Sequence, residues 1–238
     1  LNPYSMLKNN VIGTKIIAEF ALQKKIKRFI FISYDKAVNP KSILGFSKKY
    51  GEKILIDLFL RFRKKYNTIF TIVRFGNVIG SSGSVIPIFL NQISNMSPLT
   101  VTSKKVTRYF MSITEAIQLV INASYLNKKK VEIYALDMGK QINIFELAKR
   151  IIRLSGLTVK DEKKNKGDIQ IKIIGLKKGE KLYEEVTLGK NLIKTSHPRI
   201  MKCNEKLDNK KFYKKMKKIE NLLNSKNIKK NALKKIVK

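Results

Sequence analysis

Several residue types are scarce in this sequence, and each scarcity excludes something. The 238 residues contain no tryptophan, one histidine and one cysteine, Cys203. A single cysteine cannot form an internal disulfide, which fits a reducing compartment. No apolar run reaches the roughly 18 residues that a membrane-spanning helix needs, and no signal peptide is visible at the start. We therefore expect a cytoplasmic chain without a membrane span.

Acidic residues are also scarce. Only 17 Asp and Glu face 51 Lys and Arg, which gives a net charge of +34. Such an excess is typical of nucleic-acid binding, because clustered cations neutralise phosphates. However, only 8 of the basic residues are arginine, and lysines occur in nearly every segment beside isoleucine and asparagine. We favour compositional drift and expect no specific nucleic-acid partner, and keep a binder of nucleic acid or anionic surfaces as an alternative.

The sequence lacks a G-x-G-x-x-G motif, the turn that cradles the pyrophosphate of a dinucleotide. The one Gly/Ser-rich loop, residues 76–84, has the wrong spacing and follows a late strand. The chain begins with Leu1, inside a segment whose apolar residues already have helical spacing. We therefore expect a fragment whose upstream part is missing, leaving an apolar sheet edge and faces exposed.

Short apolar runs alternate with longer segments of helical periodicity. This alternation indicates βαβ units and a parallel sheet, with the run at 28–33 as a buried strand. Beyond Gly156 we expect a polar linker, a strand-like run, a helix beginning in residues 179–186 and a lysine-rich helical tail. The remaining expected strands are 69–75, 99–102 and 131–137, and the expected helices are 4–25, 44–65, 84–93, 112–125 and 142–154.

The most informative charged residues follow the first apolar run. Asp35 and Lys36 stand side by side where the strand ends, and Lys48 lies near the start of the next helix. The carboxyl ends of parallel strands face the ligand crevice of an open α/β sheet. A lysine beside an aspartate and a second lysine is also a setting in which pKa values move apart. Without further support, the pair would be read as a surface ion pair.

The chain resembles the C-terminal part of the CapD-like nucleotide-sugar 4,6-dehydratases and epimerases of polysaccharide biosynthesis, a branch of the extended short-chain dehydrogenases/reductases. Any one matching block is a weak signal, but eight occur in the family's order. They are KNNVIGT (8–14), ISYDKAVNP (32–40), GFSKKYGEK (45–53), VRFGNVIGSSGSVIPIFLNQI (73–93), LTVT with KVTRYFMSITEA (99–116), ALDMGKQINIFELA (135–148), GLKKGEKLYEE (175–185) and SHPRI (196–200).

The resemblance implies a reaction. Hydride passes from C4 of a UDP-linked N-acetylhexosamine to bound NAD(P)+, which makes the C5 proton acidic. That proton is removed while the C6 hydroxyl leaves as water, and hydride returns to C6 to give a 4-keto-6-deoxy sugar. The chemistry needs a base at C5, an acid at C6 and a proton acceptor for the C4 hydroxyl.

The resemblance also assigns roles to the turn. Lys36 would be the C5 base and Asp35 the C6 acid, and Lys48 would hold the nicotinamide ribose and lower the pKa of Lys36 together with the nicotinium charge. Asn10 and Ser33 match positions near the cofactor. Leu44 occupies the place of the fold's usual tyrosine, one helical turn before Lys48, and membrane-anchored relatives also carry an apolar residue there.

Tyr34 is the main departure, because the family has threonine at this position. Two interpretations stay open. Tyr34 supplies the phenol that Leu44 lacks, or the site is impaired or its loop rebuilt.

The substrate-binding residues implied by the resemblance lie further along the chain. Glycines let backbone N–H groups approach phosphates, a helix N-terminus favours an anion, and a guanidinium clamps a diphosphate. Lys177 replaces a family arginine and loses its bidentate fork, and Lys178 replaces a proline. His197 matches a family His-Pro and is interpreted as structural. The expected substrate-binding residues are Asn77, Ser84, Val85, Arg108, Lys177 and Glu180.

We expect an α/β fold: an incomplete doubly wound, Rossmann-like parallel sheet lacking its N-terminal strands, with a smaller C-terminal substrate-binding region. The expected boundaries are 1–156, 157–202 and a lysine-rich helical tail at 203–238. We expect a fragment of an NAD- or NADP-dependent UDP-N-acetylhexosamine 4,6-dehydratase that does not turn over alone. The alternatives are a UDP-sugar epimerase and a degenerate nucleotide-sugar-binding module. The intact parent would be a homo-oligomer, with upstream segments able to anchor it to the inner membrane, and no metal site is expected.

Overall fold

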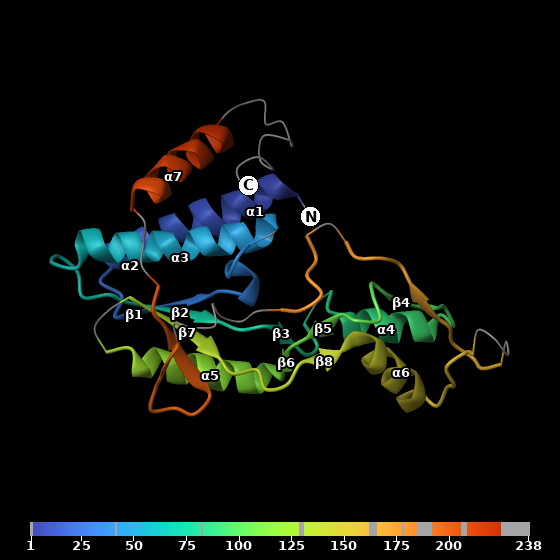
Figure 1. Cartoon of the computed structure of the whole chain (residues 1–238). Helices are drawn as coiled ribbons and strands as arrows, with labels where there is room; N and C mark the ends of the chain where they lie inside the picture. Colours follow the sequence, from blue (N-terminus) through green and yellow to red (C-terminus); the bar gives the residue numbers. More distant parts are fainter. Residues whose placement is uncertain are drawn as a thin grey trace. The chain divides into compact units, whose positions relative to one another are not determined.

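A computed structural model describes residues 2–40, 42–81, 83–128, 131–161, 166–177, 179–184, 192–205 and 209–224, without the side chains of Lys36, residues 209–211 and residue 224. These residues form an α/β fold with a mostly parallel central sheet (Figure 1). The chain divides into two compact units. Unit 1 comprises residues 1–75, 119–137 and 185–238, and unit 2 comprises 76–118 and 138–184. The boundaries expected after residues 156 and 202 stay predictions.

Unit 1 contains a five-stranded sheet in the order β1-β2-β7-β11-β10. The apolar runs predicted as strands form β1 (Arg28–Ile32), β2 (Ile69–Arg74) and β7 (Glu132–Leu136), which pair in parallel. The sheet continues antiparallel through β11 (Ile200–Cys203) and β10 (Leu192–Lys194). The parallel strand ends therefore all lie at one edge, where the residues after β1 and β2 meet.

The prediction that residues 28–33 form a buried strand is wrong. Strand β1 pairs only with β2 among the described residues, and Ile30 and Ile32 are 37% and 43% exposed. Three apolar residues that precede β1 in the sequence, Ile16, Ile17 and Phe20, are also each more than half exposed. An apolar run without polar alternation cannot show whether its second edge has a partner, so burial could not be read from the sequence.

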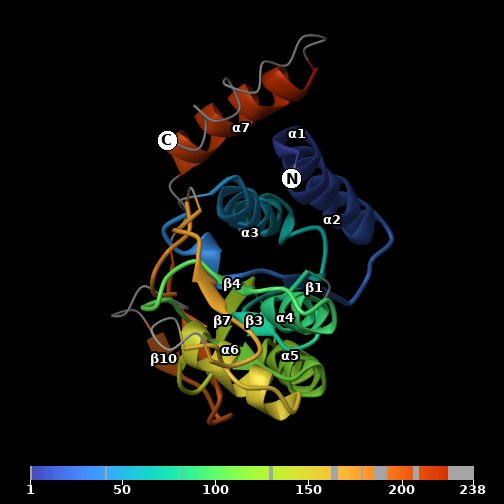
Figure 2. The same ribbon diagram turned by 90° about the vertical axis from the view of Figure 1, so that its right-hand side faces the viewer.

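Helices cover both faces of the unit 1 sheet. Helix α3 (Ile43–Phe62) lies on one face with α1 (Pro3–Leu7), α2 (Thr14–Gln23) and α7 (Asn209–Asn224), and α5 (Ile113–Leu126) begins in unit 2 and covers the other face from Leu119 onward (Figures 1 and 2). Ser42 caps α3, because its Oγ accepts the Gly45 N–H at 3.1 Å. The apolar face of α7 joins the core against α3 through Phe212, Met216, Ile219 and Leu223.

The helix expected over residues 4–25 is interrupted. Residues Lys8–Gly13 form a π-helical segment between α1 and α2. A π-helical turn holds one more residue than an α-helical turn, and such turns are frequent at functional sites. The segment contains Asn10, one of the predicted site residues, and continues directly into α2.

Unit 2 is built from short strands and two helices around its own core. Helices α4 (Val85–Ser94) and α6 (Ile144–Leu154) pack with β4 (Leu99–Val101) and β9 (Ile171–Ile173). Two further short pairs are β3 (Asn77–Val78) with β6 (Phe110–Met111), and β5 (Thr107–Arg108) with β8 (Ile142–Asn143).

The helix predicted to start in residues 179–186 is wrong over the described part, residues 179–184. That stretch forms turns and bends, and residues 185 and 186 lie outside the described residues. Gly179 has φ of +84°, a left-handed conformation that ends a helix rather than starts one. The Glu180 N–H donates to the Lys177 carbonyl at 2.9 Å, and the Glu180 Oε2 accepts the Lys177 N–H at 3.1 Å. Lys177 and Glu180 therefore close a turn with two hydrogen bonds in place of the expected first turn of a helix.

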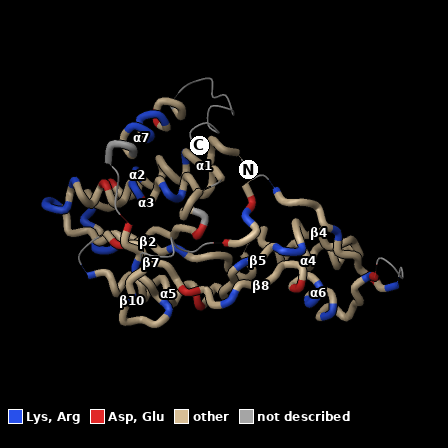
Figure 3. The backbone as a smooth tube through the Cα atoms, in the orientation of Figure 1, with Lys and Arg blue, Asp and Glu red and all other residues tan. Residues whose placement is uncertain are grey.

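Basic residues are spread along the whole chain. Figure 3 shows lysine and arginine on helices and loops of each unit rather than gathered on one element. No helix among the described residues combines the length and apolar character needed to cross a membrane.

Candidate active site

The turn after β1 is fixed by the end of β2. The Ser33 N–H donates to the Val73 carbonyl at 2.8 Å, and the Asp35 N–H donates to the Phe75 carbonyl at 3.3 Å. A short 3₁₀ turn, Asp35–Ala37, follows, and Tyr34 enters it in an extended conformation. Asp35 is only 1% exposed. The turn therefore holds a carboxyl out of bulk water at the end of a sheet strand, while the side chain of Lys36 lies outside what the structure describes.

Lys48 reaches back from α3 to the same strand end. Its Nζ donates to the Ile32 carbonyl at 3.0 Å and lies 5.2 Å from the centre of the Phe31 ring. Burial lowers the pKa of the Lys48 ammonium, and the nearby Glu52 carboxylate partly opposes that shift. The sequence expectation that Lys48 lies near the residues following β1 agrees with this contact.

Asn10 lies against the start of α3. Its side-chain amide donates to the Ser47 Oγ at 3.0 Å, and that hydroxyl donates to the Leu44 carbonyl at 2.8 Å. Asn10 is thereby linked to the residue that precedes Lys48. Unit 1 thus brings Asn10, Ser33, Tyr34, Asp35 and Lys48 to one region around the end of β1.

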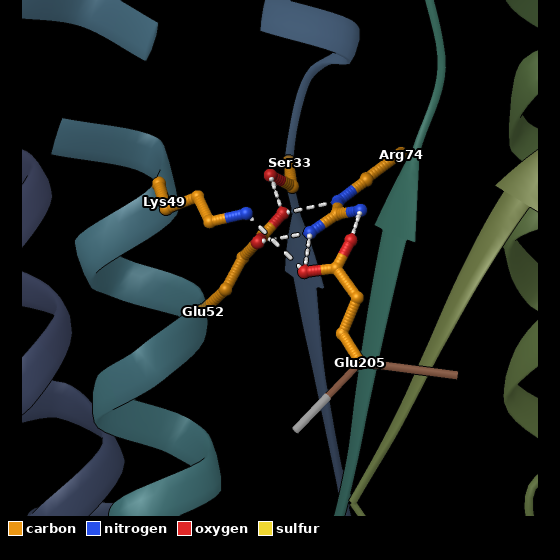
Figure 4. Close-up of polar contacts among 5 residues, drawn as sticks. All are labelled: Ser33, Lys49, Glu52, Arg74 and Glu205. Atoms are coloured by element: carbon orange, nitrogen blue, oxygen red, sulfur yellow. Dashed lines mark hydrogen bonds and ion pairs between the residues drawn. The ribbon is translucent and has the colours of Figure 1, made fainter. Parts of the chain in front are cut away.

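A buried network of ion pairs lies beside this region (Figure 4). Arg74, at the end of β2, is 0% exposed and holds Glu52 with Nε to Oε1 at 2.7 Å and Nη2 to Oε2 at 2.6 Å. Its Nη1 donates to Glu205 Oε1 at 2.5 Å, and Glu205 Oε2 pairs with Lys49 at 3.2 Å. Ser33 joins the network by donating its hydroxyl to Glu52 Oε1 at 2.5 Å.

The network shifts the pKa of its members. Burial alone would lower the pKa of Arg74, but hydrogen bonds and charges from Glu52 and Glu205 raise it instead. Burial alone would raise the pKa of Glu205, but Arg74 and Lys49 lower it to about 2. Arg74 and Glu205 therefore stay ionised in the interior over the physiological range.

Unit 2 carries the predicted substrate-binding residues around Arg108. The Arg108 guanidinium pairs with Glu180 Oε1 at 2.9 Å and with Glu184 Oε1 at 3.2 Å. It also donates to the carbonyls of Thr107 at 2.7 Å and Leu182 at 3.3 Å. These contacts use most of the five N–H groups that an arginine offers. In this structure Arg108 fastens residues 180–184 to β5.

Asn77 joins the same group through a glutamate. Its amide donates to Glu184 Oε2 at 3.4 Å, so Asn77, Arg108 and Glu180 lie together. Lys177 contributes its backbone N–H to Glu180 at 3.1 Å, while its side chain is exposed. Lys178 lies outside the described residues.

Ser84 and Val85 stand at the start of α4. Gly80 and Gly83 adopt left-handed conformations with φ of +81° and +72°, which lets the loop before the helix turn sharply. Ser84 is the N-cap residue of α4, and its buried Oγ has no hydrogen-bond partner among the described residues. A hydroxyl in that state has its bonding capacity left for a ligand or water.

Three glutamates of these networks were missed by reasoning from the sequence. Glu52 follows Lys48 by one helical turn, and this spacing could have indicated it. Glu184 lies in a block that resembles the family, but only its contact with Arg108 shows its place. Glu205 is 131 residues from its partner Arg74, and no local pattern could have paired them. His197 accepts the Arg199 N–H at its Nδ1 and closes the turn between β10 and β11.

Comparison with known proteins gives consistent results. The chain is 46% identical over 197 residues to the capsular polysaccharide biosynthesis protein CapD of Staphylococcus aureus and 47% identical over 190 residues to the probable polysaccharide biosynthesis protein EpsC of Bacillus subtilis. The matches cover 83% and 80% of this chain but 30% of each relative. The chain therefore spans less than a third of the length of these relatives.

Solved structures show the same fold. The structure of Pen from Bacillus thuringiensis superposes with a TM-score of 0.75 at 33% identity, over 87% of this chain and 61% of Pen. A UDP-glucuronic acid 4-epimerase variant from Bacillus cereus, in complex with a UDP-sugar and NAD, gives a TM-score of 0.61 at 19% identity, over 77% of this chain and 60% of that one. At 19% identity, the similarity to the epimerase shows only that the two chains share a fold.

These findings agree with the resemblance drawn from the sequence blocks. The model of the polysaccharide biosynthesis protein family matches residues 1–205, which include β1, the turn after it and both arginine networks but end before α7. The chain belongs to the polysaccharide biosynthesis protein family, whose fold is that of the nucleotide-sugar epimerases and dehydratases.

Proposed function

We propose that this chain carries the catalytic turn and the nucleotide-sugar-binding part of a UDP-N-acetylhexosamine 4,6-dehydratase. The observation that carries the proposal is the end of β1, where a buried aspartate precedes a lysine and the Lys48 amine lies 3.0 Å from the Ile32 carbonyl. In the proposal Lys36 removes the C5 proton and Asp35 protonates the leaving C6 hydroxyl. The burial of Asp35, which is 1% exposed, keeps this carboxyl out of bulk water.

The residues present fit one end of a dinucleotide. Lys48 offers an ammonium and Asn10 lies beside it, which suits the nicotinamide ribose, whereas the sequence has no G-x-G-x-x-G turn for the pyrophosphate. When bound, NAD(P)+ supplies hydride acceptance from C4 and hydride return to C6. We propose that this chain does not turn over alone, because the fingerprint that binds the rest of the cofactor is absent from its 238 residues.

In unit 2 the proposal assigns the UDP moiety to the start of α4 and the Arg108 group. The buried Ser84 Oγ and the backbone N–H groups of the first turn of α4 favour a phosphate. Arg108 would reach the diphosphate by exchanging one of its carboxylate partners, Glu180 or Glu184.

The test is calorimetric titration of the purified chain with UDP and with UDP-N-acetylglucosamine. We expect both to bind, and Arg108→Gln to weaken binding by about tenfold or more, as the loss of a charge-assisted hydrogen bond to phosphate predicts. Arg153→Gln, which changes an exposed arginine on α6 of the same unit, is the matched control. No heat with either nucleotide contradicts the proposal, and conversion of UDP-N-acetylglucosamine by the chain with NAD+ contradicts the expected inactivity.

A second candidate is a nucleotide-sugar-binding module without catalysis. Leu44 in place of the usual tyrosine and Tyr34 in place of threonine favour it. The two candidates differ in whether Lys48 binds a nicotinamide ribose, so nicotinamide mononucleotide is the discriminating probe. The dehydratase candidate predicts saturation-transfer NMR signals that Lys48→Met removes and the exposed control Lys64→Met retains, whereas the module predicts none.

A further inference from the structure

Glu52 stands where three elements of unit 1 meet. It lies on α3, is 1% exposed, and accepts hydrogen bonds from Arg74 on β2 and from Ser33 at the end of β1. A buried carboxylate is costly unless it is paired and hydrogen-bonded. Arg74 satisfies that need with two hydrogen bonds. The bond from Ser33 is therefore not required to stabilise Glu52, and its main effect is to hold Ser33 in place.

Ser33 is the last residue before the Tyr34–Lys36 turn, and it is held from two sides. Its backbone N–H donates to the Val73 carbonyl of β2 at 2.8 Å, and its hydroxyl donates to Glu52 of α3 at 2.5 Å. The strand end therefore cannot shift relative to α3 without breaking the second bond. Through this bond Glu52 fixes the position of Ser33, the residue from which the turn containing Asp35 and Lys36 begins.

Glu52 also acts on Lys48. The two residues are one helical turn apart on α3, a spacing that places side chains on the same face. Burial lowers the pKa of Lys48. Among the described charged residues, the Glu52 carboxylate opposes this shift by raising that pKa. The titratable and charged groups of the surrounding elements are Glu52 and Lys49 on α3, Tyr34 and Asp35 after β1, Arg74 on β2, and Glu205 after β11.

We infer that Glu52 is a positioning residue of the candidate active site: it holds Ser33 at the base of the turn and places a carboxylate one helical turn from Lys48. Arg74 and Lys49 pair with Glu52 and Glu205, and this pairing offsets the cost of burying the two carboxylates. The inference deepens the proposed function and rests on it for the role of Lys48. Its test, however, needs neither nucleotide binding nor turnover.

The experiment measures the reactivity of Lys48 in the full chain. Trace labelling with acetic anhydride at several pH values, followed by peptide mass spectrometry, reports the free-amine fraction of each lysine. In Glu52→Gln we expect Lys48 to label at least about twofold faster at neutral pH than in the unchanged chain, because an opposing charge one turn away is lost. Hydrogen exchange of residues 33–38 is expected to rise in the same variant, because Ser33 loses its partner on α3.

Glu205→Gln is the matched control within the network. It removes a carboxylate from Arg74 but touches neither Ser33 nor Lys48, so a merely structural role predicts the same labelling change in both variants. We expect Lys48 labelling to stay unchanged in Glu205→Gln. Equal changes in the two variants, or no change in Glu52→Gln, would overturn the inference.

Glu52→Gln leaves Arg74 with one carboxylate and can unfold the chain. In that case Glu52→Gln/Arg74→Gln replaces both partners and avoids a lone buried charge. Faster Lys48 labelling in the folded double variant supports the inference, and labelling equal to that of the unchanged chain overturns it. Loss of UDP binding in the calorimetric test leaves this result untouched, so the two proposals fail separately.

Discussion

Two arginines, one in each unit, are held between two glutamates, and their surroundings differ. Arg74 is 0% exposed, and its second carboxylate, Glu205, also pairs with Lys49, so two cations face two anions. The side chain of Arg108 is 11% exposed, and Thr102 and Asn77 also donate hydrogen bonds to its two carboxylate partners, Glu180 and Glu184. The first arginine lies wholly in the interior of unit 1, whereas the second lies nearer the surface of unit 2.

The difference teaches what each arginine can do. Removing one partner of the buried Arg74–Glu52 pair costs much stability, because it leaves the other charge buried without compensation. An arginine nearer the surface can exchange one of its carboxylate partners for a phosphate at a smaller cost. The same local chemistry therefore supports the folding of unit 1 and a proposed anion site in unit 2.

The largest expected effect is at Arg74. Arg74→Met leaves Glu52 buried and unpaired, and we expect a loss of about 3–5 kcal/mol in the free energy of unfolding, measured by urea denaturation. A loss below about 1 kcal/mol would show that water or another group takes the place of the guanidinium, and the contrast between the units would fail.

Glu205 gives the next effect, and it depends on pH. Its pKa in the folded chain is about 2, below the ordinary 4.5, so its stabilisation is complete above about pH 4.5 and is lost as the pH falls toward 2. We expect Glu205→Gln to cost roughly 2–3 kcal/mol at neutral pH and progressively less in acid. Denaturation curves of the two chains across this range check the prediction, and a pH-independent difference contradicts it.

Arg108→Met is expected to cost less, about 1–2 kcal/mol, because its partners Glu180 and Glu184 keep hydrogen bonds from Thr102 and Asn77. The measurement is again urea denaturation, with UDP affinity determined in parallel. A stability loss as large as that of Arg74→Met, without loss of UDP affinity, would make Arg108 a purely structural residue and remove the contrast.

The smallest effect sets the baseline. Lys149 and Glu146 pair on the surface of α6 at 2.9 Å, with side chains 31% and 64% exposed. Lys149→Gln is expected to change the free energy of unfolding by at most about 0.5 kcal/mol, because water screens an exposed pair. A larger loss would mean that the contribution of an ion pair to the stability of unit 2 does not follow how deeply the pair is buried.

Local patterns in the sequence predicted most of unit 1. The apolar runs gave β1, β2 and β7 and their parallel pairing, and helical periodicity gave α3 of unit 1, and also α6 of unit 2, within a few residues. The antiparallel strand β10 has only three residues, so its place in the sheet depends on pairing with a distant part of the chain that no local pattern encodes.

The candidate site divides in the same way. The turn at Tyr34–Lys36 and the approach of Lys48 follow from strand ends and helical spacing, which are local properties. Glu205, which pairs with Arg74, and Glu180, which pairs with Arg108, lie 131 and 72 residues from their arginines, so only the folded chain shows these pairs. The exposure of β1 depends on whether a neighbouring strand is present, which its own residues cannot report.

The π-helical segment Lys8–Gly13 fixes the orientation of everything before it. Each residue of an α-helix advances the chain by about 100°, so removing one residue here to restore regular winding would rotate Asn10 away from Ser47 by about that angle. The contact between Asn10 and the start of α3 thus depends on one surplus residue in the winding of the helix. A deletion in this segment would reorient that amide while leaving its chemistry intact.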